Sequence, residues 1–363
     1  MRAIVLLAVL TVFGVPGMAS AADGEFSVHG FLTQAYAASD GHQVLGITRG
    51  GTTDYRNLAV QLRYAPSSRS AFAMQLENQR IGNSPATDSN GEVKLNWAFV
   101  SHEIGGNSEI KLGKTRLPLG IYNEIRSVGS VLPFYRVPYC IYREATLTSE
   151  AVDGVVYSAG FPAGNGWRFT SDLFYGGWDT VELNGSSADP SRVDKATGAQ
   201  LWLYTPIQSM RFGAEATRAH VTPSSDQSIV RGNLDFMLFS FDGHPGPFIT
   251  QSEFFRATFS GTTYWAAYGH LGLELTRSLA LHGEVDHAHL KIRLASPLGV
   301  ESADREYLND YVLGVNYAMG YDVLLKAETH WARGFDIEDN PPDVFTGSPA
   351  RTRYFILSAS ASF

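Results

Sequence analysis

The sequence predicts an all-β protein, a transmembrane antiparallel β-barrel of about 16 strands. Three observations predict this fold: a secretory leader at the amino end, repeated alternation of apolar and polar residues, and connections that alternate between short and long. Alternation places apolar side chains on one face of a strand and polar side chains on the other. A closed barrel also leaves no strand edge unpaired in lipid, where unpaired backbone groups are costly.

The first 21 residues are predicted to form a signal peptide. Arg2 precedes a mainly apolar run over 3–15, and small residues follow through Ala19, Ser20 and Ala21, which is the pattern of a basic start, an apolar stretch and a cleavage site. The run is too short for a transmembrane helix, which needs about 20 apolar residues. We therefore expect a signal peptide over 1–21 and one barrel domain over 22–363, because no Pro/Gly/Ser-rich linker divides the remainder.

The composition disfavours several kinds of chemistry. The chain has 28 basic and 36 acidic residues, a formal net charge of −8, which disfavours a nucleic-acid partner because such affinity comes from concentrated Lys and Arg. Cys140 is the only cysteine, so no intramolecular disulfide is expected. HExxH, paired CxxC, GxSxG and Gly-rich nucleotide motifs are missing. The sequence therefore predicts no metal, no cofactor and no enzymatic activity.

The segment 282–289 contains residue types that suit a metal, but its spacing does not. On a regular strand, His282, Glu284 and Asp286 point one way and His287 and His289 the other. A zinc site needs ligands that converge. We expect the first three residues to face the lumen and the two histidines to lie outside.

Period-two alternation recurs along the chain, in segments long enough to cross a membrane as strands. It is clearest over 57–64, 72–77, 93–99, 310–317 and 323–330. In the third segment we expect Trp97 and Phe99 to face lipid together with Val93 and Leu95. Aromatic residues near the predicted strand ends, among them Trp331, suit the interfacial girdles of a membrane barrel.

The connections also fit a barrel with tight periplasmic turns and longer outer loops. Short connections are expected at 65–68, 104–107, 161–166, 205–208, 242–247, 276–278 and 319–320. Long connections are expected at 38–52, 81–92, 117–150, 177–197, 220–231, 294–305 and 334–350, with one short outer connection at 260–263. Following the chain through them gives about 16 strands with both termini on the periplasmic side. Counts of 14 or 18 remain as alternatives.

The last segment alternates up to an aromatic end. Phe355, Leu357, Ala359 and Ala361 share one face, and the sequence ends on Phe363. This resembles the C-terminal strand of Gram-negative outer-membrane proteins, in which a terminal Phe is the sorting and assembly signal. The resemblance implies an outer-membrane location and contacts with the assembly machinery, outer-membrane lipids and lipopolysaccharide. A secreted β-sandwich or β-helix would alternate too, but without the asymmetry of connection lengths.

The longest connection, 117–150, is the third outer loop in this count. Residues 111–126 read KLGKTRLPLGIYNEIR, followed by LPFYR at 132–136 and YCIYRE at 139–144. This passage resembles one found in the porin-like family that includes phosphate-selective channels. In the general porins, the third loop folds into the barrel and narrows it. The resemblance therefore implies a 16-stranded porin, as a homotrimer, with this loop in the lumen.

The chemistry of the loop predicts a charged pore constriction. Its candidate lining residues are Arg116, Tyr122, Glu124, Arg126, Tyr135, Arg136, Tyr139, Tyr142, Arg143 and Glu144. Opposed basic and acidic groups, with Glu150 among the latter, would set up a transverse field across the pore. The alternative is that several of these charges only fix the loop to the wall. The predicted lumen-facing wall residues are Arg63, Glu77, Lys94, Lys111, Lys326 and Glu328.

These features predict a porin, a water-filled channel for passive diffusion of small hydrophilic solutes or ions. The predicted inward positions mix basic and acidic residues, so the phosphate selectivity of some family members is not expected here. Three alternatives remain open. They are a substrate-specific channel for a sugar, phosphate or organic anion, an outer-membrane enzyme such as a lipase, and a structural barrel with a plugged lumen.

Overall fold

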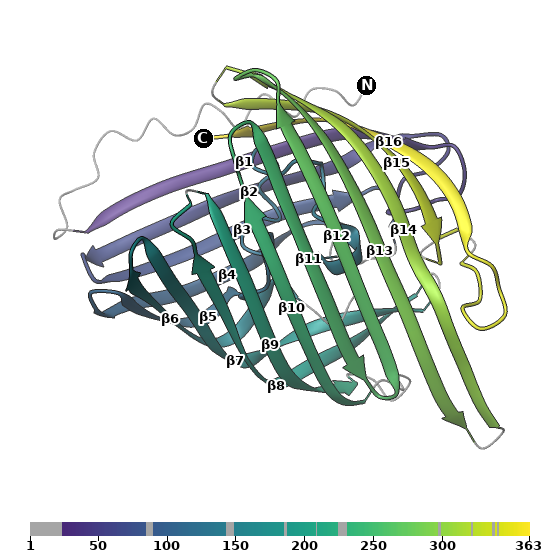
Figure 1. Cartoon of the computed structure of the whole chain (residues 1–363), viewed down its shortest axis with the longest axis horizontal. Helices are drawn as coiled ribbons and strands as arrows, with labels where there is room; N and C mark the ends of the chain where they lie inside the picture. Colours follow the sequence, from purple (N-terminus) through teal and green to yellow (C-terminus); the bar gives the residue numbers. More distant parts are fainter. Residues whose placement is uncertain are drawn as a thin grey trace.

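The alternating segments form the antiparallel strands of one closed barrel (Figure 1). The computed structural model describes residues 24–84, 90–142, 149–184, 187–207, 209–223, 231–296, 299–320, 322–335, 338–339 and 341–363. The predicted signal peptide and the predicted site residues Arg143 and Glu144 lie outside these ranges. In the described part of the chain, no helix is long and apolar enough to cross a membrane.

Each strand pairs with its neighbours in sequence, and β1 pairs with β16 to close the barrel. The strands are β1 (Glu25–Ser39), β2 (Thr52–Ser67), β3 (Ser70–Ile81), β4 (Asn90–Gly105), β5 (Ser108–Arg116), β6 (Ala151–Gly164), β7 (Trp167–Asn184), β8 (Ser187–Tyr204), β9 (Met210–Pro223), β10 (Gly232–Gly243), β11 (Phe248–Phe259), β12 (Thr262–Glu274), β13 (Leu279–Ser296), β14 (Gly299–Met319), β15 (Val323–Gly334) and β16 (Ala350–Ser362). One helical turn, α1 (Tyr139–Tyr142), lies between β5 and β6. The predicted 16-strand barrel is confirmed for the described residues.

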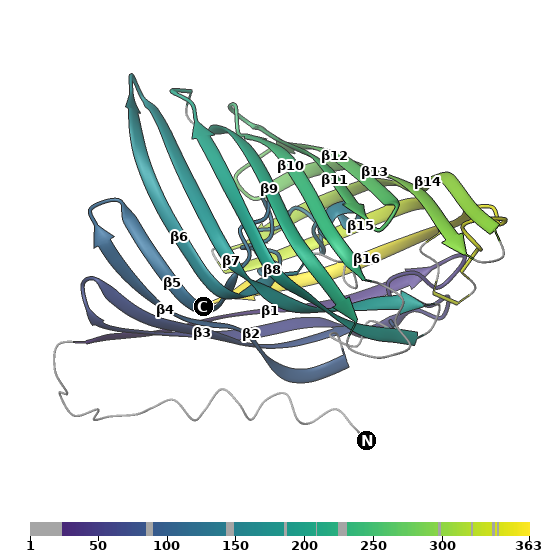
Figure 2. The same ribbon diagram turned by 90° about the horizontal axis from the view of Figure 1, so that it is seen from below.

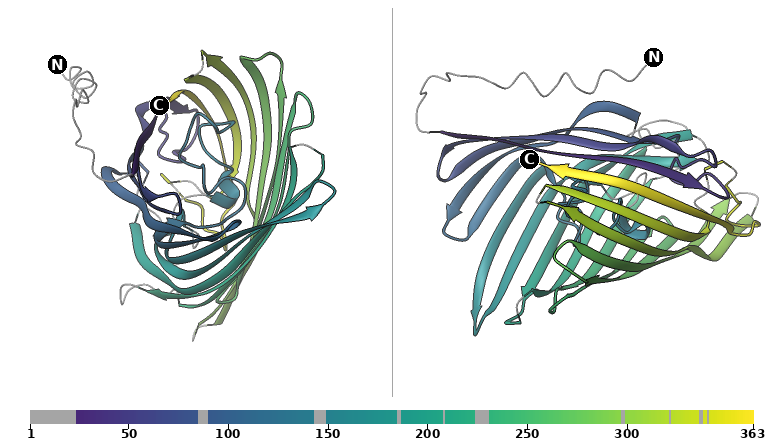
Figure 3. Two further views of the ribbon diagram at one scale, coloured as in Figure 1. Left: turned by 90° about the vertical axis from the view of Figure 1, so that its left-hand side faces the viewer. Right: turned by 90° about the horizontal axis from the view of Figure 1, so that it is seen from above.

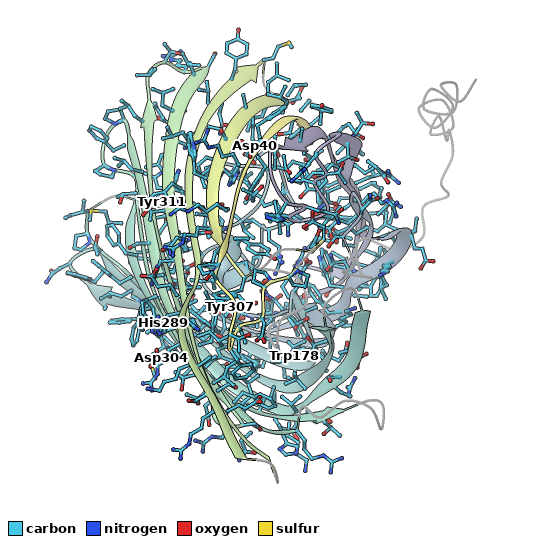
Figure 4. All side chains as sticks on the ribbon, turned by 90° about the vertical axis from the view of Figure 1, so that its right-hand side faces the viewer. Asp40, Trp178, His289, Asp304, Tyr307 and Tyr311 are labelled. Atoms are coloured by element: carbon cyan, nitrogen blue, oxygen red, sulfur yellow. The ribbon has the colours of Figure 1, made fainter. Side chains whose placement is uncertain are left out.

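The predicted two-sidedness of the strands is clear in β16. Phe355 and Leu357 are 39% and 49% exposed on the outer surface, whereas Tyr354 and Ile356 point inward and are nearly inaccessible. Figure 4 shows Tyr311 of β14 on the outer side of the wall in the same way. An outer surface of this kind, apolar and rich in aromatic rings, suits contact with lipid.

The ladder between β1 and β16 is completed by Phe363. Its backbone N–H and C=O each form a 3.0 Å hydrogen bond with Gly30 of β1. A side chain at Gly30 would meet the Phe363 ring, since a Cβ atom there would lie 2.3 Å from it. A glycine in β1 thus allows the last aromatic ring to lie against the strand.

Two predicted outer loops are wrong, because they are continuations of strands. Over 177–197, β7 and β8 stay paired as far as Asn184 and Ser187, and over 294–305, β13 and β14 stay paired as far as Ser296 and Gly299. Figure 1 shows the β13–β14 hairpin extending beyond its neighbours. Where a hairpin extends out of the membrane, both of its faces can be polar, so the alternation of apolar and polar residues no longer identifies its strands.

The orientation predicted for Trp97 and Phe99 is also wrong. A β-bulge shifts the register between Gln75 and Leu76 of β3, so that Gln75 stands across from Trp97 while Leu76 stands across from Leu95. Gln75 is fully buried on the inner side of the wall. Because a bulge adds one residue to a strand, the alternation reverses beyond it, and both rings turn inward.

Candidate pore constriction

The described residues between β5 and β6, 117–142 and 149–150, form a segment that folds into the barrel interior. In the end-on view of Figure 3, this segment lies inside the ring of strands. Its residues Leu119, Leu132 and Ile141 are buried in one apolar cluster with wall residues that include Phe236 and Tyr268. Burial of large apolar side chains on this scale holds the segment against the β6–β14 side of the wall. Figure 2 shows β1–β4 on one side of the barrel and β9–β12 on the other.

Carboxylates from three strands bind the backbone of this segment. Glu253 of β11 accepts a hydrogen bond from the Ile121 N–H (2.8 Å). Asp286 of β13 accepts one from the Tyr139 N–H (2.9 Å), and Glu328 of β15 accepts one from the N–H of Tyr135 (2.7 Å). A buried backbone N–H that has left the sheet needs such an acceptor. These inward acidic residues therefore anchor the infolded segment, and they are buried rather than exposed to a lumen.

Donors on the wall bind the same segment. Lys326 donates to the Phe134 carbonyl at 2.8 Å, and the Asn316 amide donates to the Pro133 carbonyl at 2.9 Å. Gly314 of β14 leaves room for the Phe134 ring, since a Cβ atom there would lie 2.8 Å from it. Lys326 and Glu328 thus lie on the inner face, as the sequence suggests, but they contact protein instead of lining open space.

Glu150 holds two of the predicted arginines together. Its carboxylate lies 2.8 Å from Arg116 and 3.2 Å from Arg126, and Asn96 of β4 donates to it at 3.0 Å. Burial raises the pKa of the Glu150 carboxyl, but the nearby guanidinium groups of Arg126 and Arg116 outweigh this effect and lower that pKa to about 2. Glu150 is therefore ionised at neutral pH.

Arg136 and Tyr135 lie on the same side of the segment as this cluster, toward β2. The Arg136 guanidinium donates to the Tyr55 hydroxyl at 3.2 Å and lies 5.6 Å from the centre of the Tyr139 ring. The rings of Tyr135 and Tyr55 are 4.8 Å apart. Arginine and tyrosine side chains thus face β2 across the interior.

Between the segment and the β1–β3 wall there is a narrow polar cavity of about 30 Å³. Its lining includes Arg126, Arg136 and Glu150 from the segment and Thr33, Asn57 and Gln79 from the wall. A wider cavity of about 290 Å³ lies under the segment, next to the turns at the end of the barrel where Phe363 lies, with Gln251, His270 and His282 in its lining. The narrow cavity is the candidate constriction.

Other predicted loop residues lie away from the narrow cavity. Tyr122 and Tyr142 are 1% exposed and lie against the opposite wall, where Tyr122 donates to Gln251 and Tyr142 donates to Glu253 at 2.5 Å. Burial, with nearby carboxylates as a smaller cause, raises the pKa of both phenols well above 10. Glu124 is exposed.

The remaining predicted wall residues face inward at different heights. Glu77 is buried and accepts a hydrogen bond from Asn96, and Lys94 stands across from it in the β3–β4 pairing. Lys111 lies 3.5 Å from Glu109. Arg63 lies on the same side of β2 as Gln61, which donates inward to Gln75, and it is exposed. The structure does not gather these residues into one site.

The segment 282–289 divides across the wall as its spacing suggests. His282, Glu284 and Asp286 are buried on the inner side, while the rings of His287 and His289 lie 4.9 and 5.3 Å from that of Trp265. Among the described residues, no group of three or more His, Cys, Asp or Glu side chains could hold a metal ion. Cys140 is buried with its Sγ 3.4 Å from Asp286, and burial raises the pKa of its thiol.

The predicted outer connection at 38–52 corresponds to residues 40–51 between β1 and β2, but its folding into the barrel was not predicted. Val44, Leu45 and Ile47 are buried against inner residues of the β1–β2 and β15–β16 wall, with Tyr135 packed beside them. Glu338 binds this loop by accepting hydrogen bonds from the Gly46 N–H (2.6 Å) and the Gln43 amide (3.2 Å). The sequence signal was the apolar run at 44–47 within an outer loop.

Comparisons with known proteins agree with the architecture. No family model and no characterised protein sequence matches this chain. Among solved structures, the outer-membrane channel DcaP of Acinetobacter baumannii is 11% identical with a TM-score of 0.59, covering 96% of this chain and 100% of its own. OmpF of Salmonella typhi, solved with daunomycin, is 9% identical with a TM-score of 0.60, and coverage is 93% and 97%.

An anion-selective porin from Comamonas acidovorans is 10% identical, with a TM-score of 0.57 and coverage of 94% of this chain and 100% of its own. At these identities the likeness is one of fold, over nearly the whole length of both chains. The chain therefore has the closed 16-strand barrel fold found in outer-membrane porins.

Proposed function

We propose that this protein is an outer-membrane porin of a Gram-negative bacterium, through which small hydrophilic solutes or ions diffuse passively. The observation that carries this proposal is the narrow polar cavity between the infolded segment and the β1–β3 wall, lined by charged and amide side chains. Hydrated solutes need such polar surroundings to cross a barrel. The apolar outer surface and the porin fold support the location.

The narrow cavity also supports a proposal about what would pass. A route through a cavity of such small volume, bounded by Arg126, Arg136 and Glu150, would favour ions and small solutes over bulky ones. We keep the homotrimer as part of the proposal, supported by one solved trimeric barrel of the same fold, OmpT of Vibrio cholerae, 10% identical with a TM-score of 0.55 and coverage of 94% of this chain and 99% of its own.

Single-channel recording in planar lipid bilayers tests the proposal. Folded protein is expected to give discrete, ohmic conductance steps, in groups of three for a trimer. Correctly folded protein that inserts without conductance would contradict the proposal. The same recording separates a general porin from a substrate-specific channel, because a specific solute would block the current as its concentration rises.

A plugged structural barrel is the second candidate, and one observation favours it. The infolded segment and the wall form a continuous apolar cluster that includes Leu117, Tyr122 and Trp178. Extensive packing of this kind suits a segment that fills the barrel. This candidate predicts inserted protein without conductance, which is the outcome that contradicts the channel.

A further inference from the structure

Three arginines gather on the outer surface of β15 and β16, at the end of the barrel away from Phe363. Arg333 of β15 stands directly across from Arg351 of β16, and Arg353 follows two residues later, across from Trp331. All three are exposed, and they alternate with the buried, inward-facing Ala332, Thr352 and Tyr354. Like charges directly opposite on neighbouring strands destabilise a sheet. An anion bound between these guanidinium groups would relieve their repulsion.

The barrel contains a second opposed pair that shows what such arginines bind. On β2 and β3, Arg56 stands across from Arg80, and the carboxylate of Asp54 bridges them, 2.9 Å from Arg56 and 2.6 Å from Arg80. An acidic group between the two guanidinium groups relieves their repulsion. The protein supplies that group itself at β2–β3.

At β15–β16 the protein supplies no equivalent bridge. Glu306 lies 3.7 Å from Arg333 and is itself mostly exposed, and the Asp40 carboxylate accepts a hydrogen bond from the backbone N–H of Arg353 at 2.9 Å, not from its guanidinium group. Within the part of the chain that the structure describes, the guanidinium groups of Arg351 and Arg353 have no hydrogen bond or ion pair. Two cationic groups are therefore left to bind an anion from outside the chain.

The height of the cluster along the wall indicates where that anion lies. Arg353 lies ten positions before Phe363, about 33 Å along a strand at about 3.3 Å per residue. A tilt of about 40° reduces this to a height of about 25 Å, which equals the height of the lipid-facing apolar band of such barrels. With Phe363 at one membrane interface, the arginines lie at the headgroup level of the other.

An apolar strip runs from the arginines down the outer surface. Trp331 stands beside Arg353, and Phe355 follows two residues further along β16. Tyr36 of β1 packs on Phe355 with ring centres 5.8 Å apart. Tyr311 of β14, labelled in Figure 4, stands across from Trp331 and points outward. A free anion would not use this strip, whereas the acyl chains of a lipid would lie along it.

We propose that Arg333, Arg351 and Arg353 form a binding site for the phosphate group of an outer-leaflet lipid, whose acyl chains lie on the strip below. Guanidinium groups match phosphate oxygens in geometry and charge, and basic clusters at a membrane surface bind lipid headgroups. The inference rests on the proposed outer-membrane location, but not on conduction.

The test measures lipid binding to the folded, detergent-solubilised full-length barrel by native mass spectrometry. The probes are diphosphorylated lipid A, the same lipid with both phosphates removed, and inorganic phosphate. The wild-type barrel is expected to bind diphosphorylated lipid A at least about tenfold more tightly than the dephosphorylated form, and not to retain inorganic phosphate. Equal binding of the two lipids would overturn the proposal, as would retention of inorganic phosphate in place of the lipid.

The variant R351Q/R353Q is expected to lose about tenfold or more in affinity for the phosphorylated lipid, because each guanidinium removed takes away a charge-assisted hydrogen bond. The matched control is R218Q, an exposed arginine that already binds Asp235 at 2.6 Å, and its lipid affinity should equal that of the wild type. Unchanged binding by R351Q/R353Q refutes the site. The site is also refuted if R351Q/R353Q changes the mass of the oligomer and keeps its lipid, because the arginines would then belong to an interface between copies of the chain.

Conductance of the same preparations keeps the two proposals apart. R351Q/R353Q is expected to conduct like the wild type, because the arginines lie outside the barrel. A barrel that binds phosphorylated lipid but carries no current would refute the channel and leave the lipid site standing. A barrel that conducts but binds both lipids equally would refute the lipid site and leave the channel standing.

Discussion

At the scale of single residues, the electrostatics of the narrow cavity depend on Glu150, the carboxylate that lies between Arg116 and Arg126. The lowered pKa of Glu150 means that its ion pairs stabilise the folded state above its usual pKa of 4.5. That stabilisation is lost as the pH falls from about 4.5 toward 2, where the carboxyl becomes protonated in the folded protein too.

We expect Glu150→Gln to shift ion preference toward anions. A unit charge about 6 Å from the ion path in water changes the energy of an ion by about 0.7 kcal/mol, with opposite sign for chloride and potassium, so the permeability ratio of chloride to potassium should rise about tenfold. Reversal potentials in a salt gradient at neutral pH measure this ratio. The matched control is Glu109→Gln, which removes the same charge beside Lys111 on β5. If both variants shift the ratio equally, Glu150 does not border the ion path.

The sequence was informative about the arginine cluster but not about the tyrosines. The density of Arg and Glu between 116 and 150 predicted that opposite charges meet there, and Arg116, Arg126 and Glu150 do meet. The sequence could not indicate that Tyr135 lies beside the narrow cavity whereas Tyr122 is buried against the far wall. That distinction depends on the side of the infolded segment toward which each side chain points. An irregular segment has no regular periodicity, so the direction of its side chains cannot be predicted from the sequence.

At the scale of elements, the infolded segment is held by wall side chains that pair with its backbone. Acidic residues at inward positions were predicted to line a lumen, yet Glu328 is bound to the Tyr135 N–H. Alternation predicts that such a side chain faces inward, but not whether it meets water or protein. The bulge at Asn96 of β4 and the long β7–β8 and β13–β14 hairpins were not predicted for a related reason, because the alternation of polar and apolar residues shifts or ends there.

Replacing Glu328 by Leu is expected to loosen the infolded segment. The change leaves the Tyr135 N–H buried without an acceptor, which costs about 1–3 kcal/mol, and it removes a carboxylate 3.4 Å from His330. We expect a lower thermal unfolding temperature and more frequent current closures or substates in single-channel records. Glu328→Gln, which keeps an acceptor oxygen at similar volume, is the control and should stay closer to the wild type. Identical behaviour of the two variants would argue against the backbone hydrogen bond as the anchor.

At the scale of the whole molecule, the barrel closes where β1 meets β16, and Phe363 contributes to that closure in two separable ways. Its backbone forms two hydrogen bonds with Gly30, whereas its ring is 72% exposed at the rim. The two backbone hydrogen bonds stabilise the folded barrel. An exposed ring adds little to stability, which leaves it free to act as the proposed assembly signal.

Phe363→Ala and deletion of Phe363 should therefore have different effects. The alanine variant keeps both backbone hydrogen bonds, so its unfolding temperature after refolding in detergent should stay near that of the wild type. The deletion loses both bonds, at about 1 kcal/mol each, and should unfold at a lower temperature. In cells, both variants should reach the outer membrane in smaller amounts, because both lack the ring. An alanine variant that assembles normally in cells would show that the ring is no signal, and that Phe363 acts only by closing the barrel.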